Sequence, residues 1–256
     1  MAAGNLFLMY HELEIPGRPL CQSEPGYVRY IVGEKDFRAQ VQLLKQGSLP
    51  VMNVTQSFSS KNGDGVVLTF DDGCETDLLV AAPILRDAGF NATFYITTGF
   101  LGKRGYLLPG QVRELGDAGF EIGCHSMTHP YLDEIGDAQL RKEIVEAKAQ
   151  LEQMTGRTVE HFSCPGGRWS PRVADMARQS GYLSVATSRI GRNTSTSDRY
   201  ALARVAILRA FDIATFRDLC QGQGLRQMRL REQARGMAKR LLGNSAYDRL
   251  RAKLLG

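Results

Sequence analysis

The stretch that decides the fold runs from residue 66 to residue 73 and reads Val-Val-Leu-Thr-Phe-Asp-Asp-Gly. Its first five residues are apolar or β-branched, which predicts a buried strand. Two carboxylates and a glycine follow at once, which predicts a turn directly at the end of that strand. The same change from a short apolar run to a polar or glycine-rich turn recurs along the chain.

Short apolar runs alternate with amphipathic segments on both sides of this stretch. We predict strands at 6–10, 50–54, 66–70, 92–96, 120–125, 159–164, 183–186 and 202–208, and helices at 36–46, 76–88, 109–118, 137–155 and 171–180. Asp137 is the expected N-cap of the longest helix. Strand–helix alternation indicates a mainly parallel sheet with helical crossovers. The number of strands favours an α/β barrel, although the pattern does not exclude an open sheet.

The 256 residues are 43% hydrophobic and 23% charged, a composition that excludes a disordered or fibrous chain. The length fits one barrel or two small domains. We expect a barrel over residues 1–224 and a basic helical extension over residues 225–256. The extension carries a charge of +7 and the rest of the chain −2. The excess positive charge therefore bears only on what the extension could bind.

Apolar residues in the extension recur at helical spacing, which predicts a helix whose apolar stripe packs on the barrel. The alternative is an amphipathic helix that lies on an anionic membrane. No nucleic-acid recognition motif is present. The sequence shows no secretory pattern and no long apolar run, so we expect a cytoplasmic protein, peripheral to the inner leaflet if the extension binds membrane. Five cysteines without paired spacing suggest neither a thiolate zinc site nor a disulfide framework.

Residues able to do chemistry follow three of the predicted strands. Asp71 and Asp72 follow the first, His125 and His129 the second, and the turn 165–168 the third. In a parallel α/β fold these strand ends lie on one rim. Two imidazoles and one carboxylate can hold a metal ion with open positions, and a second carboxylate beside it would be a general base. Singly, each motif has an ordinary alternative, a capped turn or a chance pair of histidines.

Thr-Phe-Asp-Asp-Gly at 69–73 and His-Ser-Met-Thr-His at 125–129 resemble the signatures of the polysaccharide deacetylase family, the chitooligosaccharide deacetylase homologues. Leu-Met-Tyr-His at 8–11 resembles the strand that opens many members. The resemblance implies a distorted (β/α) barrel of seven or eight mainly parallel strands, with 1–224 as its catalytic part. It also implies that Asp72, His125 and His129 bind one divalent metal ion and that Asp71 is the catalytic base.

The third motif departs from the family pattern. The family's arginine, which holds the base carboxylate, is replaced by Ser163. Arg168 and Arg204 are the alternatives for that role, and we favour Arg204 because its segment is similar to a Leu-Pro-Arg stretch in one branch of the family. The turn at Pro165 and Gly166 lets the backbone approach substrate closely, so we expect the Gly166 N–H to hold the oxyanion and Arg168 to lie near the substrate.

The family's late histidine, which protonates the leaving amine, is also missing, because no histidine follows position 161. His11 is the best substitute, with a capping or packing role as the alternative. Ligand type suggests zinc, while cobalt, nickel or iron are also accepted by such a site.

The expected function is hydrolysis of the N-acetyl group of an amino sugar in a cell-surface polysaccharide or its precursor. The expected partner is therefore an N-acetylated glycan. Hydrolysis of another amide or an ester, or a non-catalytic carbohydrate-binding role, are the alternatives. The sequence does not indicate the oligomeric state.

Overall fold

The computed structural model describes residues 4–60 and 63–231. Most of the predicted basic extension, residues 232–256, lies outside the described residues. Within its first residues, 225–231 are helical, Leu225 is buried and Met228 packs against the core. None of the described helices is long and apolar enough to cross a membrane.

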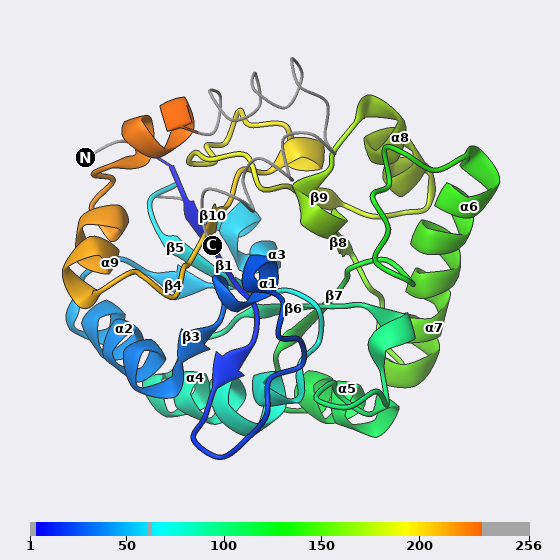
Figure 1. Ribbon diagram of the computed structural model, residues 1–256. Helices are drawn as coiled ribbons and strands as arrows, with labels where there is room; N and C mark the ends of the chain where they lie inside the picture. Colours follow the sequence, from blue (N-terminus) through cyan, green and yellow to red (C-terminus); the bar gives the residue numbers. More distant parts are fainter. Residues whose placement is uncertain (1–3, 61–62, 232–256) are drawn as a thin grey trace.

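The main sheet is parallel throughout and curls into an incomplete barrel (Figure 1). Its strands are β1 (Leu6–Tyr10), β4 (Val51–Met52), β5 (Val66–Phe70), β6 (Thr93–Ile96), β7 (Glu121–Cys124), β8 (His161–Ser163), β9 (Ser184–Ala186) and β10 (Val205–Ala206). They are ordered β10-β1-β5-β6-β7-β8-β9, and β4 pairs with β5. A second parallel pair joins β2 (Leu13–Glu14) to β3 (Val32–Gly33). The predicted distorted (β/α) barrel is confirmed.

The last predicted strand, 202–208, is shorter than expected. Only Val205 and Ala206 are a regular strand, paired with β1. Just before them, Leu202 bridges to Ala186 of β9, and the Thr187 N–H donates to the Leu202 carbonyl. The segment therefore passes from β9, at one edge of the sheet, to β1, which interrupts its regular pairing and places Arg204 between these two contacts.

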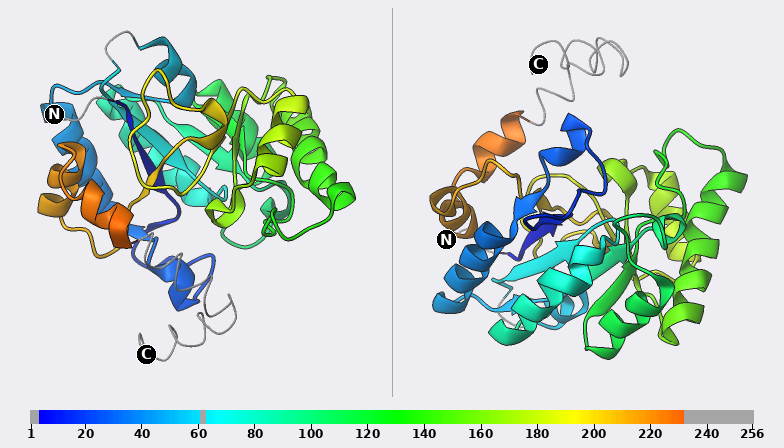
Figure 2. Two further views of the ribbon diagram at one scale, coloured as in Figure 1. Left: turned by 90° about the horizontal axis from the view of Figure 1, so that it is seen from above. Right: turned by 60° about the horizontal axis from the view of Figure 1, so that its bottom comes forward.

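Helices cover the outer face of the sheet in an arc, seen along the barrel in Figure 1 and from two further sides in Figure 2. They are α2 (Glu34–Gln46), α4 (Ala82–Ala88), α5 (Pro109–Asp117), α6 (Asp137–Arg141), α7 (Ala147–Thr155), α8 (Pro171–Gln179) and α9 (Ile213–Cys220). Two π-helical segments, η1 (Asp77–Ala81) and η3 (Lys142–Glu146), precede α4 and α7.

The predicted helices are present within a few residues of their expected bounds. The expected N-cap of the longest helix is wrong, because Gly136 takes that position and Asp137 begins the helix. Two short helices were not predicted, α1 (Pro25–Val28) and α3 (Val54–Ser59). In α3 the helix replaces the end of a predicted strand, because Asn53 and Gln56 form a reciprocal cap across its first turn.

Side-chain alternation along β5 sets which residues enter the barrel. Phe70 packs in the large outer core between sheet and helices, whereas Val67 belongs to a smaller cluster with Phe7 and Tyr95. Thr69 lies between these in sequence and its hydroxyl accepts a hydrogen bond from Arg204. A period of two therefore places Val67, Thr69 and then Asp71 on the inner side, at the carboxyl end of the strand.

Candidate active site

Two adjacent carboxylates lie at the end of β5, and the backbone turns sharply between them. Asp71 and Asp72 are both buried, at 2% and 4% exposure. Asp72 has φ of 81°, in the left-handed region that L-residues rarely adopt, and Gly73 continues at 82°. This turn separates the two side chains, so that Asp71 points into the barrel and Asp72 is presented at the rim.

The two histidines come from the loop that follows β7. His125 is buried, and its Nδ1 lies 2.9 Å from the Ser163 carbonyl oxygen of β8. Because a carbonyl can only accept, Nδ1 carries the proton and Nε2 keeps its lone pair. His129 also sits at a positive φ, 63°, and its ring packs 5.7 Å from that of Phe100. Both rings are thus held in place before any ligand binds.

Asp72, His125 and His129 converge on one point. Asp72 Oδ1 lies 3.5 Å from His125 Nε2 and 3.4 Å from His129 Nε2. The same Oδ1 is buried and has no hydrogen-bond partner among the described residues. A buried oxygen without a partner is costly unless something occupies its lone pairs, and the two imidazole nitrogens beside it can complete a donor set for a divalent cation. These three residues therefore fit a metal ion.

Arg204 holds the other carboxylate from inside the barrel. Its Nη1 and Nη2 donate to Asp71 Oδ1 and Oδ2 at 2.7 and 2.8 Å, a bidentate pair that is buried on both sides. Arg204 Nη2 also donates to the Ser163 hydroxyl at 2.7 Å, and that hydroxyl donates to Asp71 at 3.2 Å. The small side chain at position 163 leaves room for the guanidinium, which approaches from another strand.

The ionisation of this group follows from burial and from Arg204. Burial would raise the pKa of Asp71, but the positive charge of Arg204, with His125 adding to it, holds that pKa well below its usual range. Asp72 lacks such a pair, so burial raises its pKa to about 6. Burial lowers the pKa of His125 to about 3 and lowers that of His129 as well. Near neutral pH both imidazoles are uncharged, the state that binds metal.

The replacement Asp72→Asn is expected to stabilise the metal-free protein above pH 6, by up to about 3 kcal/mol. Between about pH 4 and pH 6 the folded chain keeps a proton that the unfolded chain has lost, so the contribution of Asp72 to stability falls as pH rises through this window. Urea unfolding of chelator-treated wild type and variant at several pH values measures this. A stability difference that does not grow between pH 4 and pH 7 contradicts it.

Glu143 is a functional residue that the sequence analysis missed. It lies fully buried on η3, and its carboxylate accepts hydrogen bonds from the backbone N–H groups of Met127 and Thr128 at 2.9 and 2.7 Å and from the Thr128 hydroxyl at 2.6 Å. It therefore fixes the loop that carries both histidines. A charged residue among the apolar positions of the long helix was the signal that could have pointed to it.

His11, the predicted general acid, follows β1 at the same rim, beside the residue pair Tyr10 and Phe70. Its ring stacks on Tyr30 with 4.9 Å between centroids, and its Nδ1 has no hydrogen-bond partner among the described residues. Burial lowers the pKa of His11 in spite of the nearby Asp72 and Asp71. The ring is therefore neutral near pH 7 in the metal-free protein, and its role as proton donor stays a prediction.

The turn after β8 carries the residues predicted to contact substrate. Pro165 to Gly167 form a short 3-10 turn in which Gly166 has a left-handed φ of 59°. A Cβ on Gly166 would lie 2.9 Å from the ring of Tyr131, so no larger residue fits here without displacing that ring. Arg168 stacks over Tyr131 at 4.5 Å and lies 3.5 Å from Asp133. Arg168 is thus held by the loop after β7 and does not pair with Asp71.

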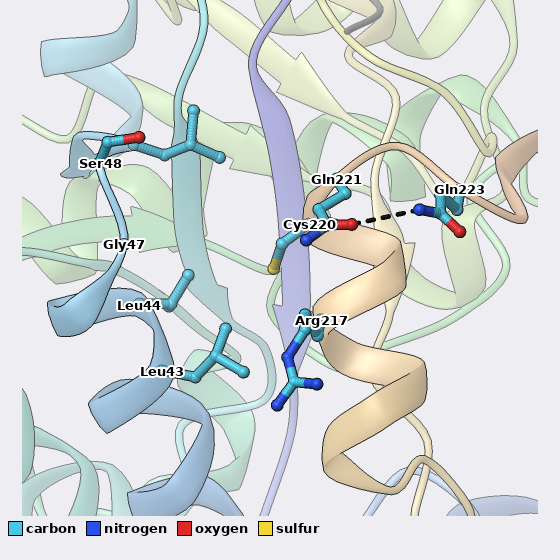
Figure 3. A pocket seen from close by; sticks show the side chains of 9 residues that line it. Leu43, Leu44, Gly47, Ser48, Arg217, Cys220, Gln221 and Gln223 are labelled. Carbon is cyan, nitrogen blue, oxygen red and sulfur yellow. Dashed lines mark hydrogen bonds between the residues drawn. The ribbon is translucent and has the colours of Figure 1, made fainter.

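A surface pocket of about 440 Å³ lies far from these groups, between α2 and α9 (Figure 3). Leu43 and Leu44 lie on one side of it, and Arg217 and Gln221 lie across from them. It contains no cluster of metal-ligating or paired acidic side chains among its described lining residues. The candidate catalytic groups lie at the barrel rim and not in this pocket.

Comparison with known proteins gives a matching family. Residues 59–185 match the model of a family described as polysaccharide deacetylase. YxkH of Bacillus subtilis (strain 168) is 25% identical over 182 residues, covering 69% of this chain and 65% of that protein. The chitooligosaccharide deacetylase of Azorhizobium caulinodans is 30% identical over 131 residues, covering 50% of this chain and 60% of its own. The chain thus spans less than two thirds of the length of both relatives.

A solved structure shows the same fold. The Streptococcus pyogenes deacetylase PplD, in complex with acetate, superposes with a TM-score of 0.73 over 83% of this chain and 96% of its own, at 22% identity. At this level of identity the likeness concerns the fold alone.

Proposed function

The chain belongs to the polysaccharide deacetylase family, and on this basis we propose that it hydrolyses the N-acetyl group of an amino sugar in a cell-surface polysaccharide or its precursor. The proposal includes a divalent metal ion, zinc by ligand type, bound by Asp72, His125 and His129, and Asp71 as the base. The observation that carries it is the contrast between the partners of two adjacent buried carboxylates, Asp71 and Asp72. One is locked to Arg204 as an anion, and the other has an unpartnered oxygen between two neutral imidazoles.

A divalent cation bound there would polarise the acetyl carbonyl and make a water molecule more acidic. Asp71 would accept the proton of the attacking water, since its lowered pKa keeps the carboxylate ionised near neutral pH. Arg204 and Ser163 fix its carboxylate, whose Oδ2 lies 3.8 Å from His125 Nε2. The Gly166 N–H is positioned on a glycine turn at the same rim and would stabilise the negative charge that develops on the carbonyl oxygen.

Removal of the metal is expected to lower acetate release at least about 100-fold, because the metal supplies several kcal/mol of transition-state stabilisation. Protein stripped with a chelator and then reloaded with zinc, cobalt or nickel is assayed for acetate released from chitin oligomers and peptidoglycan fragments. Recovery on reloading supports the proposal. Equal rates in stripped and reloaded protein contradict it.

Asp72→Asn is the matched control, since it is expected to fold well but to replace the anionic ligand beside both histidines with a neutral amide, which binds a divalent cation far more weakly. Its acetate release should not respond to added metal. A small acyl ester in the same panel of substrates tests the alternative that the protein hydrolyses esters and not N-acetyl groups. Turnover of the ester with no acetylated sugar hydrolysed would show that the proposed N-deacetylase activity is wrong.

A further inference from the structure

Two cysteine side chains meet beside the candidate metal site. Cys21 Sγ and Cys74 Sγ are 3.7 Å apart. Cys21 lies between β2 and α1, and Cys74 is the second residue after Asp72. The two residues are 53 positions apart in the sequence, so nothing in their spacing indicates that the fold pairs them.

The surroundings hold Cys21 firmly in this position. Its backbone N–H donates to both carboxylate oxygens of the buried Glu12, at 2.9 and 3.1 Å, and its thiol donates to the Gly105 carbonyl at 3.0 Å. Arg18 donates to the same Gly105 carbonyl and to Glu12. A side chain with this many fixed neighbours keeps its sulfur against Cys74 and does not sample other positions freely.

Cys74 is held from the opposite side. It forms an isolated antiparallel bridge with Tyr106, and its sulfur lies 3.4 Å from the Tyr27 hydroxyl. Cys74 is fully buried, whereas Cys21 is half-buried. A reagent arriving from solvent therefore meets Cys21 first, with Cys74 directly behind it.

We propose that Cys21 and Cys74 form a redox site in which a low-molecular-weight disulfide oxidises the two thiols to an intramolecular disulfide. The thiolate of Cys21 attacks the small disulfide, forms a mixed disulfide and releases one small thiolate. Cys74 then loses its proton and attacks the Cys21 sulfur, which releases the second small thiolate. In total two protein thiols lose two electrons, and one small disulfide is reduced to two thiols.

Closure of this bond reaches the metal site through the backbone. The sulfurs must approach from 3.7 Å to about 2.05 Å, so Cys74 or Cys21 must move. Cys74 is joined to Asp72 through Gly73 alone, and Gly73 has little space, because a Cβ there would lie 3.2 Å from Ile96. Displacement of Asp72 on the scale of an ångström can cost a rate about 100-fold. If the proposed function holds, oxidised protein should release acetate at least about tenfold more slowly.

Peptide mapping tests the covalent part directly. The five cysteines fall in five different tryptic peptides, and those of Cys21 and Cys74 are 1–29 and 62–86. The full chain is incubated with oxidised glutathione, alkylated and digested. We expect peptides 1–29 and 62–86 to be joined until a reductant is added. The mass of the joined pair should be two hydrogens below the sum of the two unalkylated peptides. Five alkylated thiols after this treatment, or a cross-link to another cysteine, overturn the proposal.

Three variants sharpen the result. Cys21→Ser should give no cross-link. In Cys74→Ser the reaction should stop at a glutathione adduct on Cys21. Cys220→Ser, a control on α9, should still form the cross-link. Acetate release of Cys21→Ser should change less than about twofold in the oxidant, against at least about tenfold for the wild type. Equal loss in both contradicts the link to the metal site. A cross-link in protein that never releases acetate supports the thiol site and counts against the proposed function alone.

Discussion

Replacement of Arg204 by methionine is expected to lower the free energy of unfolding by about 3–5 kcal/mol. The side chain is 1% exposed, and its guanidinium is the charge that balances the buried Asp71. Without it, a buried carboxylate would be left in the barrel with the Ser163 hydroxyl as a hydrogen-bond donor and His125 Nε2 3.8 Å away, and no fixed positive charge to balance it. Urea unfolding at neutral pH, with the midpoint and slope both compared with wild type, measures the loss.

Arg38 offers the matched control. It pairs with Glu34 at 2.8 Å, but on the surface of α2, with a side chain that is 58% exposed. Arg38→Met should change stability by less than about 1 kcal/mol, as solvent screens that pair. The double variant Asp71→Asn with Arg204→Met should recover part of the loss, because no buried charge is then left unpaired. A loss below about 1 kcal/mol for Arg204→Met would show that the buried pair does not stabilise the fold.

Replacement of Asp71 by asparagine is expected to lower acetate release by about 10²–10⁴, the usual contribution of a positioned general base. The amide cannot accept the proton of the attacking water, while its oxygen can still accept a hydrogen bond from Arg204. Metal content should stay near that of wild type, because Asp71 is not among the proposed ligands Asp72, His125 and His129. Elemental analysis and the acetate assay on the same preparation give the two readouts together.

The decisive outcome is the difference between the effects of the two aspartate variants on metal content and on rate. Asp71→Asn should keep the metal and lose the rate, whereas Asp72→Asn should lose both. A rate for Asp71→Asn within about tenfold of wild type would remove Asp71 from the chemistry. Loss of metal in Asp71→Asn would mean that both carboxylates bind the ion and that the base lies elsewhere.

The fold was predictable wherever burial alone sets the local structure. Strand β5 was predicted with its observed bounds. A short run of apolar residues between turns is typical of a strand that is buried on both faces of a parallel sheet. The predicted strand at 202–208 is only partly present, because tertiary pairing and not burial sets its extent. Its residues are apolar except for Arg204, but they pair with β9 at Leu202 and with β1 at Val205, and a crossing between two strands leaves no pattern in sequence.

The sequence by itself determined the chemical types and their order: two carboxylates, two histidines and a glycine turn, each directly after a buried strand of a parallel α/β fold. Strand ends of one parallel sheet share an edge, so that order was enough to predict a shared site. The tertiary structure alone decided which arginine faces Asp71, that Glu143 holds the histidine loop, and that Cys21 touches Cys74. These contacts join residues from separate segments of the chain, and their distances depend on how the sheet curls, which no local pattern encodes.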